Sequence, residues 1–420
     1  MLVLGIALAS ALFAVIVVLN FATGEKKIEH SVERLYSAAD PAFGRAMGVL
    51  LGPAILHDNR FEALLNGDRI FPAMLTAIRD ATKTITFESY IYWSDAIGKA
   101  FAEALAERAR AGVKVHVLLD WVGSNKMDPT HLAVMEAAGV EVRKFHKPDC
   151  YSLARMNNRT HRKVLVVDGK VGFTGGVGIA GLWTGNAQDP QHWRDTHFRA
   201  EGPVVAQMQA VFLDNWIKAT GAVLHGDDYF PALREAGDEA AQMFSSSPSG
   251  GSDSMHLMYL LAISAAHHSI HLSSAYFVPD ALSTRALVDA LERGVTVAII
   301  VPGKHSDAAI VRRASRARWG ALLAAGAEIH EYQPTMYHCK VLIVDGLMVS
   351  VGSTNFDTRS FRLNDEANLN IYAADFARRQ IEVFNADLSQ SRQISLHAWQ
   401  RRPLAEKFLE HAASLVGAQL

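Results

Sequence analysis

The sequence TITFESYIY, at residues 84–92, is followed by a segment with helical apolar spacing and then by GVKVHVLLD at residues 112–120. The same order returns later, where SIHLSSAYF at residues 269–277 precedes a similar segment and then GVTVAIIVP at residues 294–302. β-Branched and aromatic residues predict strands in the outer stretches, and the spacing between them predicts helices at 100–111 and 282–293. A strand, a helix and a strand therefore occur twice in this order.

The correspondence continues beyond these strands. AAGVEV at residues 137–142 matches AAGAEI at residues 324–329, and each copy then reaches a His-x-Lys segment. Alternating strands and helices predict an α/β unit with a largely parallel central sheet covered by helices. We therefore expect two tandem α-β-α sandwich domains that form a pseudo-twofold pair and pack face to face.

The repeat also predicts the domain boundaries. The first domain covers residues 61–235, the second covers 236–390, and a helical tail follows at 391–420. The junction falls at 235–252, where SSSPSGG is typical of a linker or of a loop at the domain interface. Residues 23–60 are expected to form a helical connector, whose apolar face packs either on the membrane surface or on the protein body.

The N-terminal segment has a different character. Residues 2–21 are nearly all apolar and contain no ionisable side chain. About 20 such residues in a helix cross the hydrocarbon layer of a bilayer. A cleaved signal peptide is the alternative, but no Lys or Arg precedes the apolar run. We expect one transmembrane helix at residues 1–22, and Lys26 and Lys27 predict a catalytic region on the cytoplasmic side of the cell membrane.

Composition narrows the function classes. The chain has 420 residues, of which 50% are hydrophobic and 20% charged, so it is a globular protein long enough for two domains. Its formal net charge of -2 lacks the positive surplus of proteins that bind nucleic acids. The two cysteines, Cys150 and Cys339, are too few for a disulfide framework, and we expect free thiols.

Two matching motifs carry the chemistry. HRKVLVVDG at residues 161–169 is followed by GGVG at 175–178, and HCKVLIVDG at residues 338–346 is followed by GSTN at 352–355. Strand alternation places His161 and Lys163 on one face, and it does the same for His338 and Lys340. We expect the two motifs to build a single active site.

Each motif ends in an Asp-Gly pair between two short strands, which is a strong hairpin signal. The same alternation places Asp168 and Asp345 off the face that carries the histidines. Two interpretations remain open at this point: the aspartates form the turns, or they are catalytic and orient a histidine of the other half.

Two histidines and two lysines at one place suit phosphodiester transfer. Ammonium groups supply positive charge where negative charge develops on the phosphoryl oxygens. A neutral imidazole can attack phosphorus, and a second, protonated imidazole can donate to the departing oxygen. Such a mechanism needs neither a metal ion nor another cofactor. Small groups that are expected to line the phosphate pocket are Gly175, Gly176, Ser353 and Asn355.

Each histidine also needs its second ring nitrogen held, and an acid follows each motif. These acids are Asp195 and Glu366, and their parallel positions favour a supporting role over that of solvated surface groups. A further histidine cluster, His267, His268 and His271, lacks matching Cys or carboxylate spacing, so packing or surface roles are favoured over a metal site.

With these residues in view, the chain resembles the phospholipase D superfamily, in which paired HxKxxxxD motifs precede GSxN or GGxN. Within it the chain is most similar to bacterial cardiolipin synthases, through NGD at 66–68, NRTHRK at 158–163, AYFVPD at 275–280 and NFDTRSF at 355–361. The resemblance covers residues 61–388. Gly178 stands where the family usually has Asn.

The resemblance implies that His161 is the nucleophile and His338 the general acid, although these roles could be reversed, and that Lys163 and Lys340 hold the phosphate. The implied reaction moves a phosphatidyl group from one phosphatidylglycerol to another through a phosphohistidine and releases glycerol. A lipid-hydrolysing phospholipase D, a nuclease and an inactive membrane scaffold are the competing interpretations. The N-terminal segment favours phospholipid substrates and a membrane location, and the charge disfavours nucleic acid.

Overall fold

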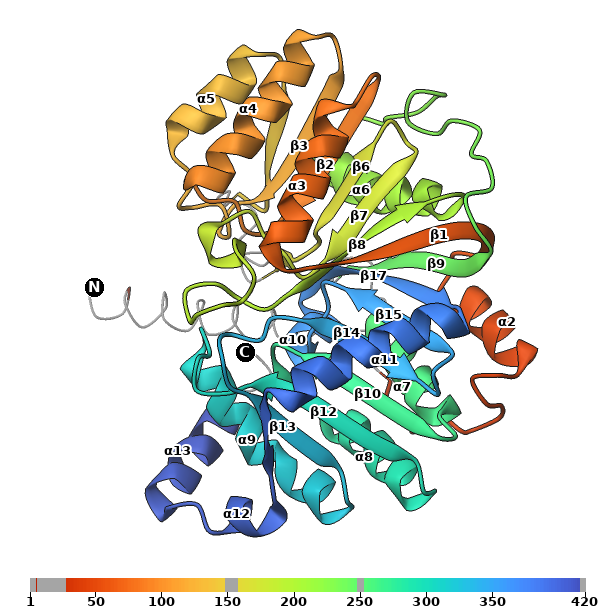
Figure 1. The fold of residues 1–420 in the computed structure, drawn as a ribbon, viewed down its shortest axis with the longest axis vertical. Coiled ribbons are helices and arrows are strands. Elements are labelled where there is room, and N and C mark those ends of the chain that lie inside the picture. Colours follow the sequence, from red (N-terminus) through yellow and green to blue (C-terminus); the bar gives the residue numbers. More distant parts are fainter. Residues whose placement is uncertain (1–4, 6–27, 148–157, 248–252, 416–420) are drawn as a thin grey trace.

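The structure is a computed structural model that describes residue 5 and residues 28–147, 158–247 and 253–415 (Figure 1). The transmembrane helix expected at residues 1–22 lies outside these ranges, residue 5 apart. In the described parts of the chain, no helix has the length and apolar character needed to cross a bilayer.

The first half is built around strand β2 (Thr84–Ser89). Two strands run parallel to β2 on one side of it, and the strands on its other side are antiparallel to their neighbours. The parallel strands are β3 (Lys114–Asp120) and β4 (Glu141–Phe145), connected through α4 (Ala96–Arg110) and α5 (Pro129–Ala137). The antiparallel strands are β6 (Val164–Val167), β7 (Val171–Gly175), β8 (Thr196–Glu201) and β1 (Leu56–Leu65). The prediction of a largely parallel sheet was therefore wrong, because hairpins build the other side.

The second half repeats this plan around β10 (Ser269–Ser274), which confirms the repeat found in the sequence. Its parallel strands are β12 (Thr296–Pro302) and β13 (Glu328–Tyr332), connected through α8 (Ala281–Glu292) and α9 (Ala309–Ala324). Its antiparallel strands are β14 (Lys340–Val344), β15 (Met348–Gly352), β17 (Asn364–Tyr372) and β9 (Glu239–Ser246).

The two halves share one continuous sheet. β1 and β9 pair antiparallel, with Asn59 opposite Glu239, so that the described residues form a 16-stranded sheet. The halves therefore join edge to edge through a strand ladder, and the expectation that the two copies pack face to face was wrong. β9 lies within the predicted junction at 235–252 and includes the first two residues of the SSSPSGG stretch, Ser245 and Ser246, while residues 248–252 lie outside the described ranges.

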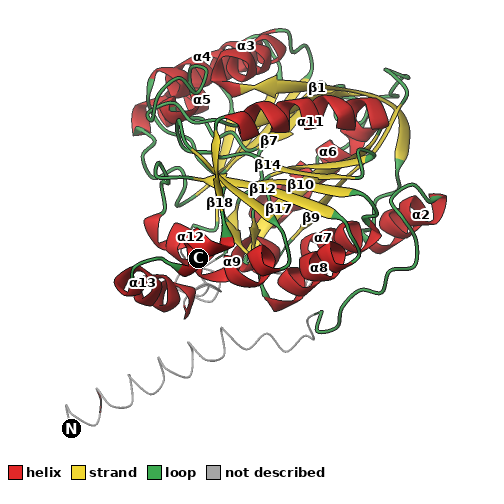
Figure 2. Cartoon of the chain, turned by 60° about the horizontal axis from the view of Figure 1, so that its bottom comes forward, coloured by secondary structure: helices red, strands yellow, loops and turns green. Residues whose placement is uncertain are grey.

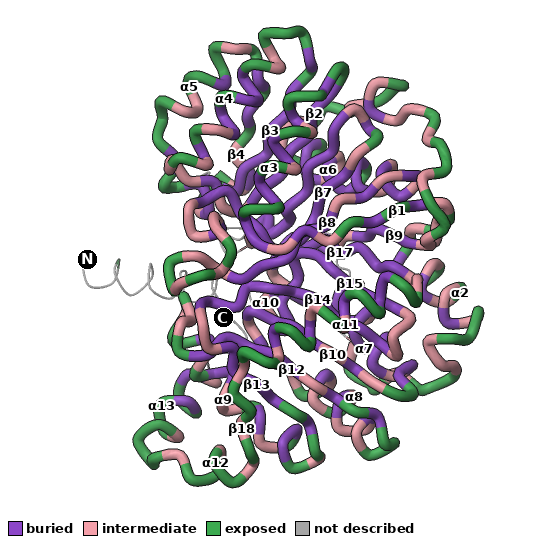
Figure 3. Tube along the Cα trace, viewed as in Figure 1, coloured by how far each residue is buried: buried purple, intermediate pink, exposed green. Residues whose placement is uncertain are grey.

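Helices cover the sheet on both faces (Figure 2). In the first half these are α3 (Asn66–Arg79), α4 and α5, with α6 (Val204–Thr220) packed against another core cluster. In the second half α7 (Ser254–Ala265), α8 and α9 correspond to them, with α11 (Ala374–Ser389) as the counterpart of α6. Figure 3 shows the strands as mostly buried, whereas the outer helices alternate between buried, intermediate and exposed residues.

The segments flanking the two halves differ from the expectation. Of the predicted connector, α2 (Pro41–Leu50) is helical, and its Phe43 and Met47 pack into the core of the second half rather than pointing outward. Residues 56–60 belong to strand β1 because Asn59 and its neighbours pair across the junction. The predicted helical tail begins with a strand, β18 (Ser391–Ile394), before α12 (Leu396–Gln400) and α13 (Leu404–Leu415).

Candidate active site

His161 is positioned by the opposite half of the molecule. It follows strand β5 (Arg159–Thr160), which pairs in parallel with β17 of the second half. The His161 backbone N–H donates to the Asp365 carbonyl at 2.9 Å. The next residue, Glu366, then places its two carboxylate oxygens 3.0 and 3.1 Å from His161 Nδ1.

His338 is held by the equivalent contacts, with the roles of the two halves exchanged. Its backbone N–H donates to the Arg194 carbonyl at 2.8 Å, and Arg194 forms a parallel bridge with Tyr337. Asp195 then lies with Oδ2 2.7 Å from His338 Nδ1. The structure thus brings both predicted acids to the histidines, and it crosses them: each acid serves the histidine of the other half.

Both imidazoles line one cavity of about 290 Å³. Because each carboxylate accepts a hydrogen bond from Nδ1, each Nε2 is left with its lone pair when the ring is neutral. The His161 ring lies 5.2 Å from the Tyr90 ring, and the His338 ring lies 5.3 and 5.4 Å from Trp183 and Trp193. Sequence analysis had not singled out the two tryptophans, and no local motif marks them.

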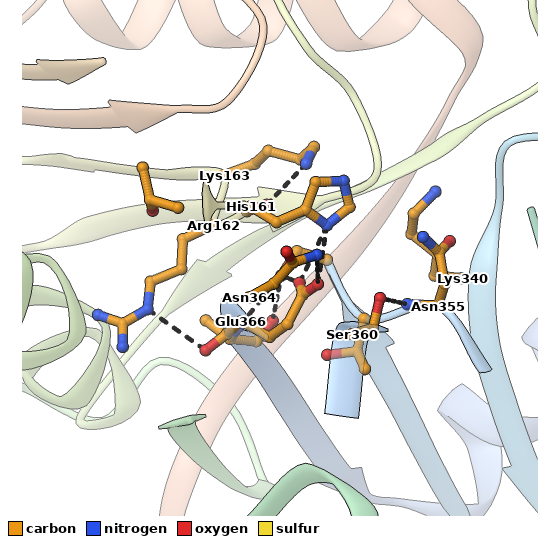
Figure 4. A network of polar contacts seen from close by, with 12 residues as sticks. His161, Arg162, Lys163, Lys340, Asn355, Ser360, Asn364 and Glu366 are labelled. Carbon is orange, nitrogen blue, oxygen red and sulfur yellow. Dashed lines mark hydrogen bonds and ion pairs between the residues drawn. The ribbon is translucent and has the colours of Figure 1, made fainter. Parts of the chain in front are cut away.

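The lysines lie beside the histidines. Lys163 Nζ donates to the His161 carbonyl at 2.7 Å and lines the cavity, and Lys340 Nζ donates to the His338 carbonyl at 2.7 Å. Arg162 extends away from them into the protein, where it donates to the Val211 carbonyl at 2.9 Å (Figure 4). The side chains of His161 and Lys163 therefore point to one side and that of Arg162 to the other, as the sequence predicted. They do so although strand β6 begins only at residue 164.

Burial changes the charge of the site. It lowers the pKa of His161 to about 4 and that of Lys163 to about 7, and it also lowers the pKa values of His338 and Lys340. Burial alone would raise the pKa of Glu366, but His161, Lys163 and the Ser353 hydroxyl outweigh it and lower that pKa. Without substrate the site therefore holds neutral imidazoles, and an entering anionic phosphodiester would favour the charged form of the cations.

These pKa shifts predict the basic limb of the pH profile. Because the lowered pKa of Lys163 is about 7, its ammonium loses its proton as the pH rises through that value. We expect kcat/KM for an anionic phosphodiester to fall up to tenfold per pH unit above about pH 7, since kcat/KM reports the free enzyme. Initial rates at low substrate across the pH range would check this, with circular dichroism as the folding control. A level profile to about pH 9 would contradict the prediction.

Gly176 and Ser353 occupy equivalent positions beside the two acids. The Ser353 hydroxyl donates to Glu366. Gly176 has no such group, and a Cβ there would lie 2.2 Å from Asp195 Oδ1, so only glycine leaves the carboxylate in place. The indole N–H of Trp183 supplies the missing donor to Asp195 Oδ2 at 2.9 Å.

Of the four residues predicted to line the phosphate pocket, only one lines the cavity. Asn355 lines it, and among the described residues its Oδ1 is buried without a hydrogen-bond partner. Gly175, Gly176 and Ser353 stand behind the histidines, where the Gly176 N–H already donates to the Thr196 carbonyl at 3.1 Å. At Gly178, the position at which the resemblance implied an Asn, a Cβ would lie 2.7 Å from Ile91 and 3.2 Å from the Trp183 ring, so this space is already filled.

Other polar side chains also line the cavity, namely Arg159, Asp307, Asp357, Arg359, Ser360 and Asn364.

Asp168 and Asp345 lie outside the cavity, at the far ends of β6 and β14. The strand rise puts them about 16 Å along the chain from the lysines. Both have positive φ, 52° and 54°, in Asp-Gly turns. The Asp345 carboxylate accepts from three consecutive backbone N–H groups, those of residues 267–269, at 2.7–2.9 Å. Of the two interpretations, the geometry supports turn formation, and it does not place these aspartates near a histidine.

Replacing Asp345 by Ala is expected to lower the free energy of unfolding by about 2–4 kcal/mol, because three backbone donors lose an ionised acceptor. Activity per folded molecule should stay within about threefold of the parent, because the residue is remote from the cavity. Denaturant unfolding and active-site titration would measure the two effects. A folded Asp345→Ala protein without activity would contradict the structural role.

His267 and His268 give their backbone N–H groups to Asp345. Within the described ranges, no three His, Cys, Asp or Glu side chains are grouped to hold a metal ion. Cys339 is buried as a free thiol, with its sulfur accepting from the Thr196 hydroxyl at 3.3 Å, and Cys150 lies outside the described residues.

Comparisons with known proteins agree with this geometry. A family model described as "Cardiolipin synthase, PLD-like domain" matches residues 74–191 and 259–388. Cardiolipin synthase 1 of Bacillus anthracis is 34% identical over 368 residues, which cover 86% of this chain and 72% of that protein. Cardiolipin synthase of Geobacillus kaustophilus is 35% identical over 360 residues, covering 85% and 72%.

Among solved structures, phosphatidylserine synthase of Haemophilus influenzae superposes with a TM-score of 0.68 over 90% of this chain and 100% of that one. At 14% identity this similarity concerns the fold alone. It supports an α/β fold, in which the family model identifies phospholipase D-like segments in both halves.

Proposed function

Because this chain belongs to the cardiolipin synthase family of phospholipase D-like phosphatidyltransferases, we propose that it moves a phosphatidyl group between two phosphatidylglycerol molecules and releases glycerol. One observation carries the proposal: two imidazoles, each held at Nδ1 by a buried carboxylate of the other half, line the same cavity. Such a pair suits a reaction with one covalent intermediate and two proton transfers.

In the first step, His161 Nε2 attacks phosphorus, and a nitrogen–phosphorus bond forms as the bond from phosphorus to the glycerol oxygen breaks. The protonated form of His338 gives its Nε2 proton to that oxygen. The lowered pKa of His161 supports its role as the neutral nucleophile, because burial removes the proton that would block attack. Lys163 and Lys340 hold the phosphoryl oxygens and balance their negative charge.

In the second step, a hydroxyl of another phosphatidylglycerol gives its proton to His338. Its oxygen attacks phosphorus, the nitrogen–phosphorus bond breaks, and both histidines return to their starting states. Asp195 stabilises the imidazolium of His338 whenever it forms, and Glu366 does the same for the phosphorylated His161 ring. Asn355, with its unpartnered buried oxygen, is suited to accept a hydrogen bond from a substrate hydroxyl.

The substrates lie in a bilayer, and we place the enzyme at the cell membrane with residues 1–22 as a single anchor and the catalytic region on the cytoplasmic side. Support comes from the uncharged apolar sequence at 2–21 and the lysines that follow it.

The test is to incubate the membrane-reconstituted protein with phosphatidylglycerol labelled in the glycerol headgroup and follow the products. Cardiolipin and free glycerol in equal amounts support the transferase. Phosphatidic acid without cardiolipin would mean that water, rather than a second lipid, takes the phosphatidyl group. A His161→Gln, His338→Gln double variant controls for contaminating activities.

A further inference from the structure

Helix α13 carries its apolar side chains on the outside. Leu404 is 82% exposed, Phe408 74% and Leu409 46%, and their spacing places them on one side of the helix. Single exposed apolar residues are ordinary on protein surfaces. Three of them on one short helix form a stripe that nothing in the described chain covers.

The opposite side of α13 is attached through ion pairs. Glu410 is only 3% exposed and binds Arg402 and Arg316, with Arg316 Nε at 3.1 Å. Ala413 is the buried apolar contact of the helix, against Val311 of α9. An amphipathic helix of a soluble protein normally buries its apolar stripe and exposes its charges. On α13 the carboxylate of Glu410 is buried and the side chains of Leu404 and Phe408 are exposed, so no described residue supplies the apolar partner of this stripe.

The helix is also connected to the lining of the active-site cavity. Ala413 belongs to a cluster that includes Val278, and Tyr276 and Ala308 pack against this cluster. The Tyr276 hydroxyl donates to Asp307 at 2.7 Å, and both side chains line the cavity. In Figure 1, α13 and α9 lie together at the outer edge of the second half.

Exposed basic residues occur on the neighbouring helix α9 and just before α13, and α13 itself carries one exposed acid, Glu406. Arg313 and Arg318 of α9 and Arg401, just before α13, are exposed. Apolar side chains beside cations are the pattern of helices that lie in the interface of an anionic bilayer. A symmetric contact with a second copy would instead bring these arginines near their own counterparts, which opposes dimerisation through this face.

We propose that the outer face of α13, formed by Leu404, Phe408 and Leu409, inserts into the surface of an anionic phospholipid bilayer and holds the cavity mouth against it. This inference rests on the proposed function for its lipid substrate and adds the surface through which that substrate is reached.

The first test places a cysteine-linked, environment-sensitive fluorophore at Phe408→Cys in the full chain, in a Cys150→Ser background. The protein is reconstituted into phosphatidylcholine vesicles that contain phosphatidylglycerol, with brominated lipid as quencher. Val223→Cys is the matched control, since Val223 is 58% exposed in the first half. We expect quenching at 408 to be at least about threefold stronger than at 223.

The second test uses the Leu404→Glu, Phe408→Glu double variant, with Val223→Glu as control and circular dichroism to verify folding. The double variant should raise KM for phosphatidylglycerol in vesicles about tenfold, while its turnover of detergent-dispersed substrate stays unchanged. Equal quenching at 408 and 223 would overturn the proposal. So would concentration-dependent association in detergent that buries the fluorophore, because a second copy would then be the partner. Strong lipid quenching at 408 in a protein that makes no cardiolipin would support the docking surface and reject the proposed function.

Discussion

Replacing either His161 or His338 by Gln is expected to reduce phosphatidyl transfer at least about 10³-fold, since one variant loses the nucleophile and the other the general acid. Both rings are buried against aromatic side chains, and glutamine retains polarity and similar bulk, so the fold should persist. Initial rates of cardiolipin and glycerol formation, normalised to folded protein, measure the effect. His192→Gln is the matched control, because His192 contacts Asp189 outside the cavity.

An activated substrate distinguishes the role of the nucleophile, His161, from that of the general acid, His338. A phosphatidyl ester with an acidic leaving group departs without a proton, so His338→Gln should still release it once and accumulate a phosphorylated protein. His161→Gln should release none. Mass spectrometry of the acid-labile adduct would locate the phosphorus on His161. An adduct on His338 in the His161→Gln variant would reverse the two assignments, and full activity of either variant would refute the paired mechanism.

Replacing Glu366 by Gln, or Asp195 by Asn, is expected to lower kcat about 10²–10⁴-fold while leaving KM nearly unchanged. Each carboxylate accepts the Nδ1 proton of one imidazole, at 3.0 Å for Glu366 and 2.7 Å for Asp195. An amide can donate instead of accept, so it favours the tautomer with the proton on Nε2. This removes the lone pair with which His161 attacks phosphorus, or the one with which His338 takes the proton of the acceptor hydroxyl.

Double variants distinguish this role of Glu366 from a purely structural one, because only the former makes the losses of activity from Glu366→Gln and His161→Gln non-additive. Combining Glu366→Gln with His161→Gln should cost little beyond His161→Gln alone, because the carboxylate acts through that ring. Combining Glu366→Gln with His338→Gln should cost more than either single change. Ser353→Ala, which removes the donor to Glu366 but keeps the charge, should lose only about tenfold. Additive losses in both double variants would contradict the crossed pairing.

Local sequence predicted much of each half. The strands at residues 84–89 and 269–274 and the helices that follow them lie within a few residues of the expected positions, because apolar periodicity reports burial directly. The strands at the junction of the two halves were missed. Ser245 and Ser246 of β9 belong to the stretch that was predicted as a linker, yet seven residues of β9 pair with β17. Strand pairing supplies hydrogen bonds that composition does not reveal.

By itself, the sequence determined that this protein is a duplicated α/β chain with two His-x-Lys pairs and two following acids, because repeats, periodicity and motif spacing are local properties. Only the tertiary structure decided which acid serves which histidine. Glu366 lies 205 positions from His161, and the contact exists because β5 pairs with β17 in one register. A strand pattern with a period of two fixes which face a side chain occupies, but it does not name the partner strand. The positions of Asp168 and Asp345 also follow from strand geometry. The hairpin turns hold both residues at the strand ends far from the cavity, next to the backbone of residues 82–84 and 267–269.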